Sequence, residues 1–217
     1  LGDNWPLFLI LPLAGLLVGW ITQTWAPESE GHGTEQLIRT FHNLGGAVRK
    51  RVIFIKALTS AITIGSGGSA GQEGPVAQIG SGVGSTASHA MGLGDRDRRI
   101  FLLAGASAGI GALFTAPLAG ALFAPEVLYR KPEFEGDAII PCIISSIVAY
   151  TTFTGITGET KAIHISEKVL STLNQGDPRE LLLYFVLALL CTAVSFLYVK
   201  CFNGIHTVFN GMTWLWK

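Results

Sequence analysis

The sequence predicts an all-α integral membrane protein, and the first reason is its composition. Of the 217 residues, 49% are hydrophobic and only 14% are charged, and the mean hydropathy is +0.46. A soluble domain carries about a quarter charged residues. The charges are also clustered, so long uncharged runs separate them. The formal net charge is zero and no basic face is evident, which argues against a nucleic-acid partner.

The second reason is the series of apolar runs. Residues 5–25 extend from Trp5 to Trp25 without a charge, and about twenty apolar residues span a bilayer. A short polar helix is expected to follow, from about Gly31 to Leu44. Further helices are predicted over residues 52–64, 75–91, 100–114, 117–128, 137–154 and 179–216. We expect residues 95–99 and 155–177 to form loops.

Several of these segments are too short to cross a membrane alone, because glycines and prolines interrupt them. Interrupted membrane helices are typical of transporter and channel binding sites. A multi-pass membrane protein with such a site is therefore expected. The three cysteines, Cys142, Cys191 and Cys201, lie in apolar segments without metal-ligand spacing. We interpret them as buried free thiols, and we expect neither a metal site nor a cofactor.

The candidate site is the glycine-rich stretch of residues 65–75. Its glycines allow close approach of a ligand, and Pro75 suits the first turn of a helix. A helix start presents free N–H groups and a partial positive charge, so it attracts anions. Glu73 places a negative charge where an anion would bind. It can therefore compete with an anion for the same site.

Other interpretations of these residues remain open. The glycines also loosely match the G-x-G-x-x-A pattern of a dinucleotide-binding fold, although no alternating strand–helix pattern accompanies them. Glu73 could be only a charge at the start of a helix. His32 could be a helix cap or a packed histidine, instead of an anion ligand.

Three motifs resemble those of the CLC chloride channel and transporter family. Residues 71–80, GQEGPVAQIG, resemble its G-[KR]-E-G-P motif. Residues 115–126, TAPLAGALFAPE, are similar to its N-x-P-L-[AG]-G-x-L-F-x-x-E segment. Residues 26–33, APESEGHG, are similar to the stretch that leads into its G-S-G-I-P motif. The order and spacing of the motifs agree over residues 26–135.

The resemblance implies a bundle of tilted, partly broken helices built as two inverted repeats. Residues 1–217 would be a partial transmembrane domain, comprising the first repeat from its third helix to the long helix that leads to the second repeat. The second-repeat motif G-x-F-x-P is not present in the sequence. The resemblance also implies a homodimer through helices 117–128 and 137–154, embedded in the lipid bilayer of a bacterial inner membrane.

The family's site residues transfer to this chain position by position. Glu73 matches the gating glutamate, and Val127 stands where proton-exchanging members often have a second, inward-facing glutamate. Gln72 replaces the usual Arg or Lys, and His32 replaces the usual serine of the inner gate. The residues that the resemblance places around the anion are Gly31, His32, Gly33, Gln72, Gly74, Pro75 and Val76.

The resemblance implies transport, with chloride as substrate, and no enzymatic activity. We expect a channel of the voltage-gated type that conducts passively, since Val127 cannot relay a proton. A proton-coupled chloride antiporter is the alternative, and a non-transporting, truncated membrane subunit is a third possibility. Because Pro75 is retained, chloride-like anions are favoured over fluoride.

Overall fold

The computed structural model describes residues 5–128, 136–158 and 178–211, and all regular elements in these ranges are helical. No strand lies within them, so the dinucleotide-binding interpretation is wrong. The chain divides into two compact units, Leu1–Ile163 and His164–Lys217. Each unit is described by itself.

The helices follow the predicted segments closely. The first unit contains α1 (Trp5–Trp25), the 3₁₀ turn η1 (Pro27–Ser29), α2 (Thr34–Asn43), α3 (Lys50–Gly65), α4 (Glu73–Ala90), α5 (Asp95–Leu113), α6 (Pro117–Val127) and α7 (Gly136–Thr157). The described helix of the second unit is α9 (Pro178–Gly211). The predicted loop 155–177 starts too early, because residues 155–157 still belong to α7. Residues 159–177 and the predicted helix end at 212–216 lie outside the described residues.

One predicted loop is helical. Residues 95–99 form the first turn of α5, which follows Gly94. Asp95 and Asp97 both lie in this turn. Carboxylates stabilise a helix start because the free N–H groups there carry a partial positive charge. The charge cluster that suggested a loop therefore begins a helix.

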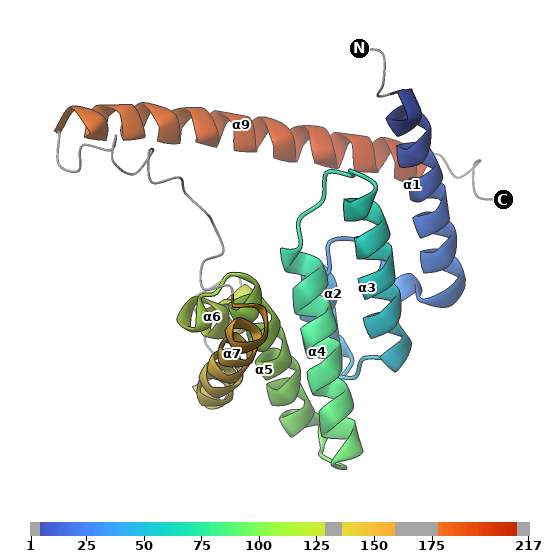
Figure 1. Ribbon diagram of the computed structural model, residues 1–217, viewed down its shortest axis with the longest axis vertical. Coiled ribbons are helices and arrows are strands. Elements are labelled where there is room, and N and C mark those ends of the chain that lie inside the picture. The colour runs from blue at the N-terminus through green and yellow to red at the C-terminus, as the bar shows by residue number, and fades with distance from the viewer. Residues whose placement is uncertain (1–4, 129–135, 159–177, 212–217) are drawn as a thin grey trace. The chain divides into compact units, whose positions relative to one another are not determined.

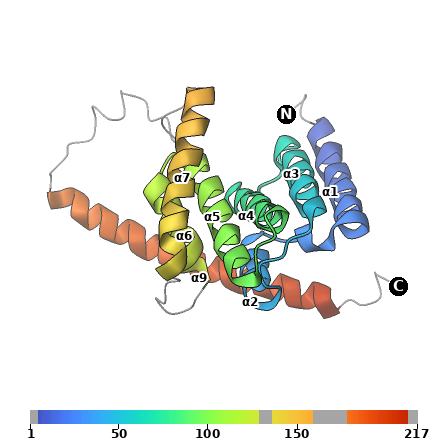
Figure 2. The same ribbon diagram turned by 90° about the horizontal axis from the view of Figure 1, so that it is seen from below.

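Helix α4 lies at the centre of the first unit, between α3 and α5 (Figure 1). Figure 2 shows α1 beyond α3 and the pair α6 and α7 beyond α5. The main apolar core combines side chains from α2, α5, α6 and α7. Its fully buried members include Leu37, Leu102, Leu103, Ala121 and Cys142.

Glycines bring α4 and α5 into backbone contact. A Cβ atom at Gly80 or Gly84 would overlap the backbone carbonyl of Gly105 or Phe101 on α5. Gly82 faces α3 instead, where a Cβ would lie 2.6 Å from Ile53 Cγ1. Small residues at helix interfaces allow this close approach in membrane proteins. The glycines of α4 therefore allow its backbone to pack directly against neighbouring helices.

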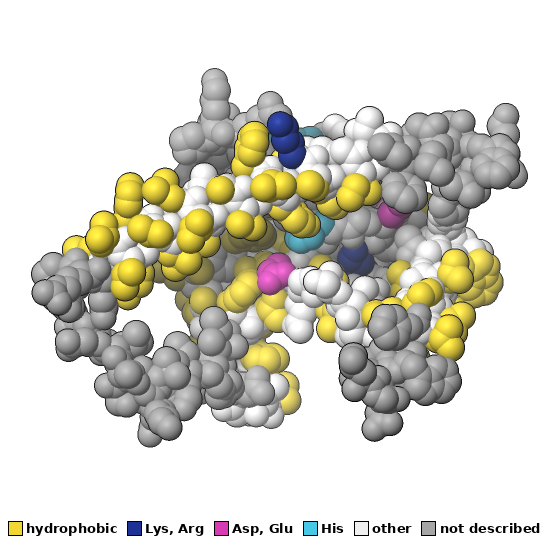
Figure 3. Space-filling model, turned by 90° about the horizontal axis from the view of Figure 1, so that it is seen from above, with side chains coloured by type: hydrophobic (Ala, Val, Ile, Leu, Met, Phe, Trp, Pro, Cys, Tyr) yellow, Lys and Arg dark blue, Asp and Glu magenta, His cyan; other side chains and the backbone are white. Residues whose placement is uncertain are grey.

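Two described helices are long and apolar enough to cross a membrane. These are Gly136–Thr157, with 22 residues and a mean hydropathy of 1.7, and Leu181–Ile205, with 25 residues and a mean hydropathy of 2.4. Figure 3 shows hydrophobic side chains along the displayed face of α9. Cys142 is buried as predicted, but Cys191 and Cys201 are exposed free thiols. The prediction of burial was wrong for these two cysteines, because every described side chain of α9 is exposed.

Candidate functional site

The starts of α2 and α4 are in direct backbone contact. Gly33 caps α2 with a φ of +106°, and a Cβ atom there would lie 2.5 Å from the carbonyl oxygen of Gly74. In return, a Cβ at Gly74 would overlap the carbonyl oxygen of His32. Both positions therefore require glycine. The structure thus brings His32 and Gly33 together with the first turn of α4.

Both helix starts retain backbone N–H groups that have no carbonyl acceptor among the described residues. In α4, Val76 N–H donates to Gln72 O at 3.0 Å and Pro75 has no N–H, so the amides of Glu73 and Gly74 remain. In α2, Leu37 N–H donates to Gly33 O at 3.0 Å, which leaves the amides of residues 34–36. Unpaired N–H groups of this kind make a helix start attractive to anions.

Glu73 is the first residue of α4, and its side chain is exposed. The carboxylate turns back toward the preceding residues. It lies so close to Gly71 that a Cβ atom there would overlap Glu73 Oε2. Gln72 beside it is also exposed. A carboxylate in this place fits both a simple charge at a helix start and a group that competes with an anion.

His32 is exposed and lies at the start of α2. Its Nδ1 is 2.8 Å from Thr34 Oγ1, with the donor set by the tautomer. This hydrogen bond links the ring to the first residue of α2. The contact is between two side chains and Gly33 is the N-cap of α2, so His32 does not cap this helix; the hydrogen bond holds the imidazole beside the helix start.

Two buried side chains that the sequence analysis overlooked hold the loop before α2. Lys56 is only 5% exposed, and its Nζ donates to the carbonyls of Ser29 at 2.9 Å and Gly31 at 2.6 Å. Gln78 is 2% exposed, and its Nε2 donates to Glu28 O at 2.8 Å. A signal for Lys56 existed, because it is the only charge in the apolar run 52–64. Ionisable residues in such runs are functional candidates by default.

An ion pair between Glu28 and Arg49 adds a third attachment for this loop. Partial burial by itself raises the pKa of Glu28, but the hydrogen bond and charge of Arg49 lower it. The net pKa lies below the usual glutamate range. Arg49 immediately precedes α3, so the pair joins η1 to the start of that helix.

Val127, the last residue of α6, is half-buried and packs against the main apolar core. It provides no titratable group. Its neighbour Glu126 is exposed.

Comparison with known proteins assigns the chain to a family. A family model described as voltage gated chloride channel matches residues 14–217. The chain belongs to this family. It is therefore a member of a membrane protein family of channels and transporters, and not an enzyme.

Individual relatives within the voltage gated chloride channel family have different names. The chain is 34% identical over 145 residues to a chloride/fluoride channel protein of Pseudomonas syringae pv. tomato. This alignment covers 67% of the chain and 31% of the relative. It is 32% identical over 179 residues to an H(+)/Cl(-) exchange transporter ClcA of Vibrio vulnificus, covering 82% and 37% respectively. An uncharacterized protein of Methanocaldococcus jannaschii is 28% identical over 204 residues, covering 94% and 48%. The chain thus spans less than half the length of each of these relatives.

Proposed function

We propose that this chain forms part of a transmembrane chloride pathway and that Glu73 is its gate. The observation that carries the proposal is the position of the Glu73 carboxylate at the start of α4, where the amides of Glu73 and Gly74 are unpaired. An anion and this carboxylate would compete for the same partial positive charge. Protonation or displacement of Glu73 would then admit the anion.

The remaining proposed ligands contribute in different ways. Gly74 offers a free amide, whereas Pro75 has none and the Val76 amide is occupied. Pro75 and Val76 therefore shape the site without donating to an anion. On the other side, Gly31, His32 and Gly33 form the loop before the free amides of α2, and Gln72 adds a neutral polar side chain beside Glu73.

The proposal is tested by replacing Glu73 with Gln in the full-length protein, reconstituted in liposomes. We expect chloride flux to become nearly independent of pH, because the neutral side chain no longer competes with the anion. Glu126→Gln is the matched control, since it neutralises an exposed carboxylate at the C-terminal end of α6, not at the start of a helix. A pH dependence that persists in Glu73→Gln would contradict the gating role.

We propose passive conduction as the transport mode. Proton exchange requires a route to Glu73 from the inner side, and Val127 has no proton to relay. Proton-coupled exchange is the second candidate, favoured by the relatives named as H(+)/Cl(-) exchange transporters. Under a chloride gradient, a reversal potential that stays at the chloride equilibrium value when a pH gradient is added supports conduction. Uphill proton movement driven by chloride supports exchange.

We further propose that the chain is the first of two inverted repeats and that α6 and α7 pair with a second copy. The supporting observation is an exposed apolar face on these two helices, formed by Leu118, Leu122, Ile140, Ile144 and Ile147. Ile147→Trp should lower the dimer fraction of the full-length protein in detergent. A substitution on another exposed apolar helix, Leu16→Trp in α1, should leave it unchanged. An unaltered dimer fraction for Ile147→Trp would favour lipid contact for this face.

A further inference from the structure

A basic hollow lies at the end of α4 opposite Glu73. It has a volume of about 660 Å³ and is bordered by the α2–α3 connection, the last turns of α4 and the first turn of α5. Among its lining residues none is acidic. The polar and charged members of the lining are Arg49, Lys50, Arg51, Ser85, Thr86, His89 and Arg98. This concentration is local, because the chain as a whole has no net charge.

The positive charge of the hollow is only partly neutralised. Arg49 pairs with Glu28, and Arg98 Nη1 donates to Asp95 Oδ1 at 3.1 Å. Lys50 and Arg51 are exposed, and no acidic partner for either lies among the described residues. Two permanent positive charges are therefore available to an anionic ligand.

Two buried polar atoms beside the hollow lack hydrogen-bond partners among the described residues. These atoms are Thr86 Oγ1 and Arg98 Nε. Buried polar groups are nearly always hydrogen-bonded, so an orphan group calls for an explanation. Neither atom is exposed to the hollow, so direct contact with a ligand falls to the exposed charges of Lys50 and Arg51.

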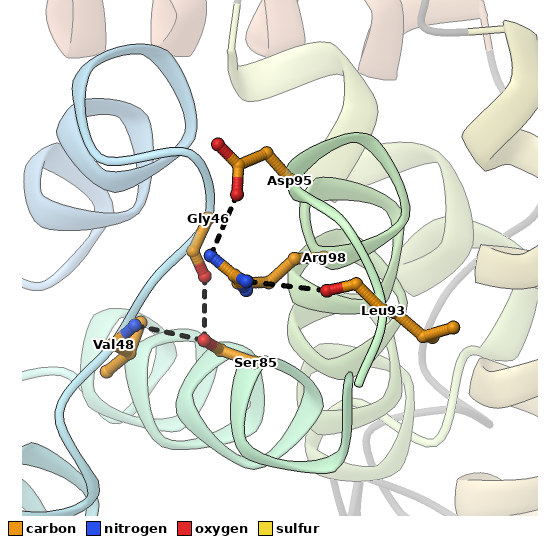
Figure 4. Close-up of polar contacts among 6 residues, drawn as sticks. All are labelled: Gly46, Val48, Ser85, Leu93, Asp95 and Arg98. Carbon is orange, nitrogen blue, oxygen red and sulfur yellow. Dashed lines mark hydrogen bonds and ion pairs between the residues drawn. The ribbon is translucent and has the colours of Figure 1, made fainter. Parts of the chain in front are cut away.

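The walls of the hollow are fixed by hydrogen bonds (Figure 4). Ser85 Oγ accepts from Val48 N–H at 2.9 Å and donates to Gly46 O at 2.7 Å, which ties the α2–α3 connection to α4. A Cβ atom at Gly46 would lie 2.9 Å from Arg99 N, so the same connection lies directly against the start of α5. The backbone that leads into the basic run 49–51 is thus held in place before any ligand arrives. Preorganisation of this kind lowers the cost of binding.

We propose that this hollow binds phosphate groups. Arginine matches phosphate oxygens with paired N–H groups, and lysine adds a compact charge. The ligand is either the headgroup of an anionic phospholipid or a free polyphosphate. The positive-inside tendency puts residues 49–51 at the cytoplasmic surface, where anionic headgroups gather. Phe54 and Leu58, exposed by 73% and 46%, follow Lys50 at intervals of four residues on α3, so they offer an apolar track for an acyl chain.

The test uses the purified full-length protein and two probes. Native mass spectrometry measures the binding of phosphatidylglycerol, with phosphatidylcholine as the neutral comparison. Isothermal titration calorimetry in neutral detergent measures the binding of pyrophosphate. We expect the double variant Lys50→Gln/Arg51→Gln to weaken binding of the preferred probe about thirtyfold, at roughly fivefold for each charge near a membrane surface. Both side chains are exposed, and chloride flux checks that the variant is folded.

The matched control is Arg39→Gln/Arg96→Gln, which removes two exposed positive charges of the first unit that do not line the hollow. It should bind both probes like the wild type. Preference for phosphatidylglycerol identifies a lipid headgroup as the source of the phosphate, and preference for pyrophosphate identifies a soluble one. Failure of both probes to bind, or equal weakening in the two double variants, would overturn the proposal.

Discussion

The two helix starts that meet in the candidate site use the same backbone chemistry but are held very differently. The start of α2 follows a loop fixed by three side chains, of which Lys56 and Gln78 are almost completely buried. The start of α4 follows a stretch of exposed glycines and carries the exposed carboxylate of Glu73. The start of α2 is therefore held in a fixed position. The start of α4 carries a side chain, Glu73, that is free to reorient.

This difference suggests a division of labour. Unpaired amides attract an anion at either start, so attraction alone does not distinguish them. A group that opens and closes must have two positions of similar energy, and an exposed carboxylate on a single flexible side chain meets that condition better than a buried network. The fixed start of α2 would then keep the site in shape while Glu73 moves.

The largest effect is expected when the contact between the two starts is broken. Gly74→Ala introduces a Cβ that overlaps His32 O, a backbone atom that cannot move alone. We expect a loss of stability of about 1–3 kcal/mol, as for other overpacked positions, together with loss of chloride flux. Thermal unfolding and flux of the full-length protein measure both.

The control for this substitution is Gly19→Ala. Gly19 lies within α1, and nothing stands within 4 Å of a Cβ built there. An alanine favours the helix at such a position. Equal unfolding temperatures for Gly74→Ala and the wild type would show that the two starts are not in contact.

The next largest effect concerns the loop before α2 alone. Lys56→Met removes the donor to the carbonyls of Ser29 and Gly31 while retaining an apolar chain of similar length. Leaving buried acceptors unpaired costs about 1–3 kcal/mol. We expect a lower unfolding temperature and a weaker apparent affinity for chloride. Lys50→Met, at the exposed start of the same helix, should change neither quantity.

An unfolding temperature of Lys56→Met equal to that of Lys50→Met would mean that the loop before α2 is held by other contacts. Gln78 would then be the next residue to replace, because it binds Glu28 O in the same loop.

The sequence allowed prediction of the helices because each apolar run is bounded by glycine, proline or charge. The family motifs assigned residues 31–33 and Gly74 to one anion site, and the structure shows His32 and Gly33 in backbone contact with Gly74. The sequence did not reveal the roles of Lys56 and Gln78, since their partners are backbone carbonyls that lie 25 and 50 positions away. No local pattern encodes such contacts. Similarly, the sequence did not reveal that Val76 N–H is paired with Gln72 O. This hydrogen bond forms because α4 starts at Glu73, two residues before the predicted start at Pro75.

A smaller effect is expected from a substitution that displaces the Glu73 side chain at the start of α4. Gly71→Ala places a Cβ where Glu73 Oε2 now lies, and the carboxylate can move away because it ends a flexible side chain. We therefore expect stability to change by less than about 1 kcal/mol but the balance between open and closed gate to shift. Flux at neutral pH is the measurement.

The background of Glu73→Ala sharpens this comparison. With no carboxylate to displace, adding Gly71→Ala should leave the flux unchanged. A further change in flux in the double variant would show that Gly71 acts through the backbone and not through Glu73.

The smallest expected effect is the pH dependence of the ion pair between Glu28 and Arg49. The pKa of Glu28 is lowered in the folded protein, so the pair contributes stability above the ordinary glutamate pKa of about 4.3, and this contribution is lost as pH falls through the folded value. Because the two side chains are 33% and 56% exposed, the contribution should stay below about 1 kcal/mol. Unfolding temperatures of the wild type and Glu28→Gln, compared from pH 7 downward, should differ at pH 7 and converge only once the pH has fallen below the lowered folded pKa of Glu28. Arg49→Gln provides the matched control, since removing the other partner should produce the same convergence. A difference that persists in both variants below that folded pKa would mean that the two side chains stabilise the loop by packing and not by charge.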